Sequence, residues 1–481
     1  MTTPQIKQQG LPKEILMAAW AIALGAIAPM LDSTMVNIAV DEINKDFNTT
    51  LGTIQWAITG YVLALAMAVP LSGWLMNKFN GKKVFIGAVI AFGVTSVLAG
   101  LSWDVSSFIL FRLLQGFSAG IITPLMSTLL VKTAGPDNLG KVMAIVSTPM
   151  IFGPILGPVI GGFLVQGASW HWIFFINVFI VVIAVPLMIK TIPDFEPFNK
   201  ESKLDLFGMI TLSFMSAALI YGITKAADHA SFNNGETRLW AGIGLGLAVL
   251  YIVYNRIRNH QTVLPMNLFA HKSFSASSIG LFLANMAVMG PMLILPLFFQ
   301  TFRHFTAIEA ALALIPQGIG MLVTRPLIGT LIDKIGAKYV VMVSLVLSLI
   351  GSIPLMFITD QTSMIWISLV LFIRGTSFGG IMLPLTSDAY TGLDTNQLPE
   401  AGVGINMIEN LGSSFGSAVI ATVVATAGHA GQGLQPTLAQ GLKGYHAGFL
   451  VSALVLTLIF IPGLFLTHRS LRRGLRGRLT R

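Results

Sequence analysis

Two carboxylic acids stand inside long apolar stretches of the sequence, where a charge is costly. Asp32 lies within the stretch 15–40, and Glu409 lies within the stretch 401–427. A charged side chain in hydrocarbon is strongly disfavoured, so each acid is expected to face a cavity or a polar partner. A carboxyl group whose exposure alternates between a buried site and water can take up and release a proton. Asp32 and Glu409 are therefore candidates for proton coupling.

Arg112 is the candidate partner of Asp32. It lies in the apolar stretch 107–131, at a depth similar to that expected for Asp32. Burial favours the neutral acid, whereas a nearby guanidinium favours the carboxylate, so the two effects oppose each other at Asp32. A site balanced in this way can exchange protons, which makes Arg112 the third proton-coupling candidate. The alternative is a static ion pair that only fastens two helices together.

Glu409 belongs to a polar stripe. Asn406, Glu409 and Ser413 recur at positions i, i+3 and i+7, which places them on one face of a helix. Gly412 and Gly416 recur at a spacing of four, which suits close packing of an adjoining face against another helix. Glu409 is expected either to bind substrate or protons in a central cavity, or to form a buried structural hydrogen bond.

The composition indicates that these residues lie in a membrane protein. Of 481 residues, 54% are apolar and 10% are charged, against about a quarter charged in soluble domains. A bilayer core needs about 20 apolar helical residues, and fourteen stretches reach this length. They cover residues 15–40, 54–76, 83–102, 107–131, 142–166, 171–192, 204–224, 238–256, 274–299, 308–332, 338–358, 362–387, 401–427 and 445–467. The polar breaks between them are too short for a soluble catalytic domain. The absence of Cys excludes thiolate nucleophiles and Cys-ligated metals.

Lys and Arg are distributed unevenly over the polar breaks. With both chain ends in the cytoplasm, 21 of the 29 Lys and Arg fall inside, five fall outside, and Arg112, Arg325 and Arg374 lie within spans. Cytoplasmic loops carry an excess of Lys and Arg. The sequence therefore predicts a multi-pass protein of the cell (inner) membrane with both termini cytoplasmic. The basic segment 469–481 is expected to contact the lipid surface rather than nucleic acid.

The chain contains an internal repeat. The segment PLSGWLMNK (70–78) matches PLIGTLIDK (326–334) at five positions, with an offset of 256 residues. Two such copies indicate an all-α integral membrane fold with two six-helix bundles and two inserted helices. The expected divisions are 1–192 for the first bundle, 193–272 for the inserted helices, 273–468 for the second bundle and 469–481 for the tail. Duplicated bundles are typical of alternating-access transporters, which bind substrate near the membrane midplane.

Five motifs carry a resemblance to a known family. They are LDSTMVNIAV (31–40), GWLMNKFNGKK (73–83), RLLQGFSAG (112–120), GPILGPVIGG (153–162) and WHWIFFINV (170–178). Together they resemble the 14-helix drug:proton antiporters of the major facilitator superfamily, the EmrB/QacA type. The resemblance covers residues 10–470 and implies roles for Asp32 and Arg112 in proton coupling and cation recognition.

The resemblance also implies gating residues. In span five, small residues permit close helix approach and prolines bend the helix, although packing alone is the alternative explanation. The gating candidates are Gly73, Asn77, Lys78, Lys82, Gly153, Pro154, Gly157, Pro158, Gly329, Asp333 and Lys334. Asn77 and Asn80 depart from the family pattern, which has Asp and Gly there. The family Asp latches the cytoplasmic side, so a neutral Asn77 is expected to weaken that latch.

Polar, aromatic and Met side chains are expected to line the central cavity. Aromatic rings attract cations and thioethers adapt to varied ligands, although ordinary packing is the alternative for each residue. The substrate-binding candidates are Asp32, Trp56, Tyr61, Gln115, Asn285, Met289, Asn406 and Glu409.

These patterns favour a proton-coupled multidrug exporter of lipophilic, mainly cationic compounds. The alternative is export of an endogenous metabolite, lipid or siderophore on the same fold. No enzyme activity, cofactor, metal or nucleic-acid partner is expected. The expected partners are lipophilic small molecules, protons and the lipid bilayer, with a periplasmic adaptor in a Gram-negative host not evident from the residues.

Overall fold

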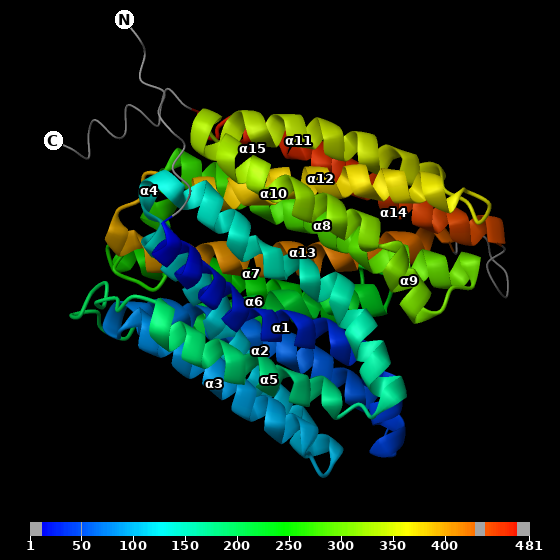
Figure 1. The fold of residues 1–481 in the computed structure, drawn as a ribbon, viewed down its shortest axis with the longest axis horizontal. Helices are drawn as coiled ribbons and strands as arrows, with labels where there is room; N and C mark the ends of the chain where they lie inside the picture. Colours follow the sequence, from blue (N-terminus) through cyan, green and yellow to red (C-terminus); the bar gives the residue numbers. More distant parts are fainter. Residues whose placement is uncertain (1–11, 50, 429–437, 469–481) are drawn as a thin grey trace, which may run out of the picture.

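The fold is a bundle of long helices. A computed structural model describes residues 12–49, 51–428 and 438–468, and the regular elements of these residues are all helices. In Figure 1 the helices run close to parallel or antiparallel to one another, with α1, α2, α3 and α5 on one side and α8, α10, α11, α12 and α14 on the other. This confirms the predicted all-α membrane fold.

The first half of the chain contains five helical elements. They are α1 (Lys13–Asp46), α2 (Leu51–Lys78), α3 (Gly81–Gly100), α4 (Val105–Gly167) and α5 (Trp172–Thr191). The side chain of Asn80 accepts a hydrogen bond from the backbone N–H of Lys83 at 3.2 Å and begins α3. Asp104 and Ser107 form a capping box that begins α4. Such caps satisfy backbone donors that would otherwise lack partners at the start of a helix.

Helix α4 consists of two arms. Gly135 interrupts it with φ 64°, a conformation that glycine adopts without strain, so residues 105–135 and the residues up to 167 form separate spans. Thirteen helices of the described part are long and apolar enough to cross a membrane. The second arm of α4 corresponds to the predicted span 142–166. Counted with the other thirteen, it gives the predicted number of fourteen spans.

Two inserted helices connect the halves. They are α6 (Leu206–Asp228) and α7 (Gly235–Ile257), and the side chains of Asp205 and Asn234 cap their first turns. Ser213 of α6 donates to the carbonyl of Met67 in α2 at 2.6 Å, while Ala226 of α6 accepts from Thr422 in the second half at 3.4 Å. Helix α6 therefore bridges both halves of the molecule.

The second half repeats the long-helix pattern of the first. Its elements are η1 (Met266–Ala270), α8 (Lys272–Arg303), α9 (Ala307–Ala313), α10 (Ile315–Ile335), α11 (Ala337–Ser352), η2 (Ile353–Phe357), α12 (Met364–Ala389), η3 (Thr395–Gln397), α13 (Leu398–Gly428), α14 (Leu438–Leu458) and α15 (Phe460–Gly463). Gly336, with φ 89°, makes the sharp turn between α10 and α11. Each predicted span of this half corresponds to one or two of these helices.

The outer surface of the bundle is apolar. Large hydrophobic side chains such as Ile365, Val323 and Phe163 are exposed, as expected where lipid replaces water as the solvent. The chain is therefore a multi-pass membrane protein. One end of the bundle carries Lys78, Lys82, Lys200, Lys203 and Lys334, at or beside the ends of α2, α3, α6 and α10. This end is called the basic end below.

Candidate functional site

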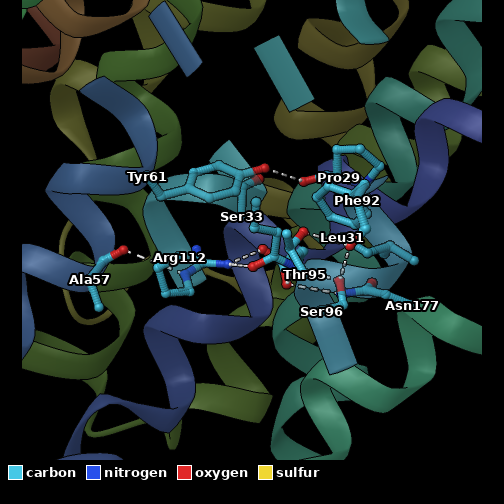
Figure 2. Close-up of polar contacts among 12 residues, drawn as sticks. Pro29, Leu31, Ser33, Ala57, Tyr61, Phe92, Thr95, Ser96, Arg112 and Asn177 are labelled. Carbon is cyan, nitrogen blue, oxygen red and sulfur yellow. Dashed lines mark hydrogen bonds and ion pairs between the residues drawn. The ribbon is translucent and has the colours of Figure 1, made fainter. Parts of the chain in front are cut away.

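The predicted pair of Asp32 and Arg112 is present and buried. Asp32 of α1 is 0% exposed and Arg112 of α4 is 1% exposed. A guanidinium nitrogen of Arg112 donates to the Asp32 carboxylate in an ion pair. Figure 2 shows the Arg112 side chain pointing toward the side of the cluster where Ser96 and Asn177 lie. Opposite charges at this depth offset part of each other's desolvation cost.

Two amides complete the surroundings of Asp32. Gln115 of α4 and Asn177 of α5 each donate to the same carboxylate oxygen, at 3.1 and 2.9 Å. The Gln115 amide also donates to the hydroxyl of Ser96 in α3, at 2.7 Å. Four helical elements thus meet at one buried carboxylate, so movement of any of them changes its hydrogen bonds.

Aromatic rings surround the guanidinium of Arg112. Its central carbon lies 4.2 Å from the ring centre of Tyr61 and 5.6 Å from that of Phe174. The Tyr61 hydroxyl donates to the carbonyl of Pro29 in α1 at 3.5 Å, and Arg112 also donates to the carbonyl of Ala57 in α2. Cation–π contact adds to the ion pair in holding this cation in place.

The Arg112 guanidinium has a second acceptor beside the Asp32 carboxylate. Three donors converge on that carboxylate, and removing one partner from a buried ion pair leaves an uncompensated charge. Gln115 already accepts a hydrogen bond from the same nitrogen of Arg112, which gives the guanidinium an alternative contact.

The glycines of span five pack directly against the helix that carries Asp32. A Cβ on Gly153 would lie 2.9 Å from the carbonyl oxygen of Met30, and one on Gly157 would overlap the hydroxyl of Thr34. The Thr34 hydroxyl donates to the Gly153 carbonyl at 2.9 Å. The second arm of α4 thus contacts α1 on both sides of Asp32 in the sequence. The side chains of Pro154 and Pro158 lie outside the described residues.

Glu409 lies half-buried on α13 in the second half. No described residue forms a hydrogen bond or ion pair with its carboxylate. Within its stripe, Ser413 donates to the carbonyl oxygen of the Asn285 side chain in α8 at 3.3 Å, while Asn406 donates to the backbone of its own helix. A Cβ on Gly412 would lie 2.5 Å from the Phe282 carbonyl oxygen, so the predicted close packing of α13 is directed at α8.

Within the described residues, the buried arginines of the second half, Arg374 and Arg325, have no acidic partner. Arg374 is 0% exposed, none of its guanidinium nitrogens finds a hydrogen-bond partner in the described part of the chain, and its nearest ring is Phe378 at 4.6 Å. Arg325 is 4% exposed and lacks partners for two of its nitrogens. The two halves therefore share a fold while the buried carboxylate–guanidinium pair is found in the first.

The two halves meet at the basic end. Asn77 of α2 donates to the Glu400 carboxylate of α13 at 2.9 Å. A Cβ on Gly73 would lie 2.8 Å from Val403, and the Thr128 hydroxyl of α4 donates to the Leu398 carbonyl at 3.5 Å. At the other end of α1, the side chains of Ser33 and Asn37 are exposed. The molecule is thus closed at its basic end, beside Asn77.

The remaining predicted residues are more scattered. Trp56 stacks on Tyr221 of the inserted helix α6, with ring centres 6.0 Å apart. Lys78 donates to the carbonyl of Lys200 at 2.8 Å. The other candidates lie on three helices: Met289 on α8, Lys82 on α3, and Gly329, Asp333 and Lys334 on α10. The described residues contain no group of three or more acidic, His or Cys side chains suited to a metal ion.

Sequence reasoning missed three residues that the structure places in the Asp32 cluster or in contact with Asn77. Asn177 and Ser96 belong to the Asp32 cluster, and Glu400 is the partner of Asn77. Asn177 is a lone amide in an apolar span, which is a usable signal because an amide in hydrocarbon needs a partner. Glu400 offers no comparable signal, since its position at the start of α13 resembles a surface residue.

Comparison with known proteins agrees with this architecture. A model of the Major Facilitator Superfamily matches residues 22–417. The multidrug resistance protein B homolog of Mycobacterium tuberculosis is 28% identical over 427 residues, covering 88% of this chain and 79% of that protein. The multidrug export protein EmrB of Escherichia coli is 27% identical over 423 residues, covering 86% and 82%. The structure of the proton:xylose symporter XylE covers 93% of this chain and 96% of its own, with a TM-score of 0.62 and 16% identity, and shares the fold. The chain belongs to the major facilitator superfamily.

Proposed function

We propose that this chain is a proton-coupled multidrug antiporter that exports lipophilic cations by alternating access. The observation that carries the proposal is the buried carboxylate of Asp32, held by donors from α4 and α5 and by the ion pair with Arg112. A carboxylate whose partners come from several moving helices changes its affinity for protons when those helices move. The multidrug relatives support the class of cargo.

The basic end is the cytoplasmic end in this proposal, and both termini face the cytoplasm of an inner or plasma membrane. The Asn77–Glu400 contact then closes the cytoplasmic side, while the exposed Ser33 and Asn37 face outward. Cargo leaves and a proton binds from this state. In the opposite state the contact is broken, Asp32 loses its proton to the cytoplasm, and cargo binds.

The free energy available from one proton depends on the charge of the cargo. One proton moving through about 100 mV releases about 2.3 kcal/mol. Since about 1.4 kcal/mol corresponds to a factor of ten, this sustains roughly a 40-fold gradient of a neutral cargo. A monovalent cation exchanged for one proton moves no net charge, so that exchange uses only the pH difference.

The test is cation-driven proton movement in reconstituted vesicles. Ethidium and tetraphenylphosphonium are added to vesicles that contain wild type, Asp32→Asn or the surface control Asp228→Asn, with a pH dye inside. We expect proton movement with wild type and with Asp228→Asn, whose carboxylate is half-exposed at 51%. Asp32→Asn is expected to abolish it.

A wild-type protein that moves no protons with any cation contradicts the drug-export proposal. The same vesicles then serve to test the alternative cargo, an endogenous metabolite, lipid or siderophore. Proton movement that survives in Asp32→Asn would keep the antiporter activity but remove Asp32 from it.

A further inference from the structure

An apolar groove opens on the side of the bundle between α2, α4 and the inserted helix α6. Its volume is about 580 Å³, which is within the usual range of small-molecule sites. It is lined by Ala64, Met67, Leu71, Trp74, Leu113, Leu114, Phe117, Leu204, Leu206, Met209, Ile210, Ser213 and Phe214. Ser213 is the polar member of this lining, and its hydroxyl is already donated to the Met67 carbonyl. The groove therefore suits a hydrocarbon ligand.

The groove runs from the middle of the bundle to the basic end. Its α2 wall extends from Ala64 to Trp74, four residues before the end of that helix at Lys78, and its opposite wall begins at Leu204, two residues before α6. Leu114 and Phe117, on the α4 wall, are 46% and 40% exposed on the lipid-facing side of the bundle. The groove thus lies at the depth of one bilayer leaflet, the leaflet at the basic end.

Lysines lie at the basic end of the two helices that form the walls of the groove. The backbone N–H groups of Phe198 and Asn199 donate to the carbonyls of Met76 and Asn77, which fixes the loop before α6 against the end of α2. Lys78, at the end of α2, donates to the carbonyl of Lys200 in this loop, and Lys203 directly precedes the lining residue Leu204. Lys200 pairs with Glu196 at 3.5 Å, whereas the exposed Lys203 has no acidic partner within the described residues.

We propose that this groove binds an anionic glycerophospholipid, with one acyl chain between α2, α4 and α6 and its phosphate beside Lys203 and Lys78. The wall residues provide van der Waals contact along the acyl chain, which is the force that holds apolar surfaces together inside a bilayer. Basic residues near the membrane surface attract an anionic headgroup, which favours an anionic lipid over a zwitterionic one. The bound chain completes the packing of α6, which bridges the two halves.

Trp74 supplies a reporter inside the groove. The protein is reconstituted with phosphatidylglycerol or phosphatidylcholine that carries bromine on its acyl chains, which quenches tryptophan on close contact. The contribution of Trp74 is the difference in quenching between wild type and Trp74→Phe. We expect this difference to be at least twofold larger with brominated phosphatidylglycerol than with brominated phosphatidylcholine.

Two pairs of variants assign the selectivity to this groove. Lys203→Gln is expected to lower the phosphatidylglycerol value to that of phosphatidylcholine, while Lys83→Gln, an exposed lysine at the start of α3, leaves it unchanged. Ala64→Phe, which blocks the inner end of the groove, is expected to lower quenching of Trp74 by both lipids. Val343→Phe, at a lipid-facing position of α11 with 62% exposure, is the matched control.

Three results would overturn the proposal. If both lipids quench Trp74 equally in wild type, the groove does not select anionic lipid. If Lys83→Gln lowers the phosphatidylglycerol value as much as Lys203→Gln does, the selectivity comes from general surface charge and not from this groove. Relief of the quenching by tetraphenylphosphonium assigns the groove to a lipophilic cargo instead.

Discussion

Asn77 and Glu400 are 323 residues apart in the chain, and the amide of one donates to the carboxylate of the other at 2.9 Å across the two halves of the molecule. In the family pattern an Asp occupies the place of Asn77. Here an Asp would face the carboxylate of Glu400. The neutral amide therefore matches its partner, and the departure from the family motif has a local electrostatic reason.

Replacing Asn77 by Asp is expected to open the basic end. Two carboxylates at hydrogen-bond distance repel each other, so Asn77→Asp should favour the state in which the halves separate there. The sequence has no Cys, so a single reporter Val403→Cys, next to Gly73, can be labelled without background. Its labelling rate is expected to rise several-fold in Asn77→Asp.

The second-site change Glu400→Lys provides the control. Combined with Asn77→Asp it creates an opposite-charge pair and should return the labelling rate to the wild-type value. If Asn77→Asp labels at the wild-type rate, the Asn77–Glu400 contact does not hold the basic end closed.

Gly157 is expected to tolerate no side chain. In Gly157→Ala the new Cβ overlaps the Thr34 hydroxyl, and overpacking of this kind costs about 1–3 kcal/mol. Thr34→Ala removes that hydroxyl, so the double variant should recover part of the lost thermal stability and transport. Gly242→Ala on α7 is the control, since nothing lies within 4 Å of its Cβ. Equal melting temperatures of Gly157→Ala and Gly242→Ala would contradict the packing of α1 on α4.

The Asp32–Arg112 pair is expected to show strong coupling in a double-mutant cycle. Asp32→Ala leaves the guanidinium buried and unpaired, which costs about 3–5 kcal/mol. Arg112→Met alone leaves the carboxylate unpaired, while the double variant removes both charges and should be more stable than Asp32→Ala. Thermal unfolding in detergent measures this. Additive losses in the double variant would show that the two side chains do not interact.

Glu409 is expected to determine how much net charge crosses the membrane in each transport cycle. Its carboxylate has no hydrogen-bond or ionic partner among the described residues, so it is available to carry a second proton. Exchange of two protons for one monovalent cation depends on the membrane potential, whereas exchange of one proton does not. Export of tetraphenylphosphonium should respond to an imposed potential in wild type and lose that response in Glu409→Gln. An unchanged response would assign Glu409 a structural or cargo-binding role.

Helix positions could be predicted from the sequence because a bilayer imposes one length and one polarity on every span. The break at Gly135 followed from the polar gap between two apolar stretches, and α9 with α10 together occupy one predicted span. The pairing of Asp32 with Arg112 was also predictable, because two opposite charges at one depth in hydrocarbon need each other.

Contacts across the bundle were less accessible to sequence reasoning. Which of several amides reaches Asp32 depends on helix rotation and tilt, so Asn177 was missed although it lies in a recognised motif. The contact of Trp56 with Tyr221 was not predicted, because it depends on the inserted helices, whose position a twelve-helix repeat does not specify. Glu400 was also missed, because the residue that it contacts, Asn77, lies in the other half of the molecule.

The most direct test of the central claim is proton release on cargo binding to the purified protein in weakly buffered detergent. Tetraphenylphosphonium is titrated into wild type, Asp32→Asn and Asp228→Asn, while a pH dye and the bound cation are measured together. We expect wild type and Asp228→Asn to release protons in proportion to the cation bound, and Asp32→Asn to release fewer protons per bound cation. Binding of the cation to wild type with no release of protons at any pH between 5 and 8 would contradict exchange of cargo and proton at Asp32.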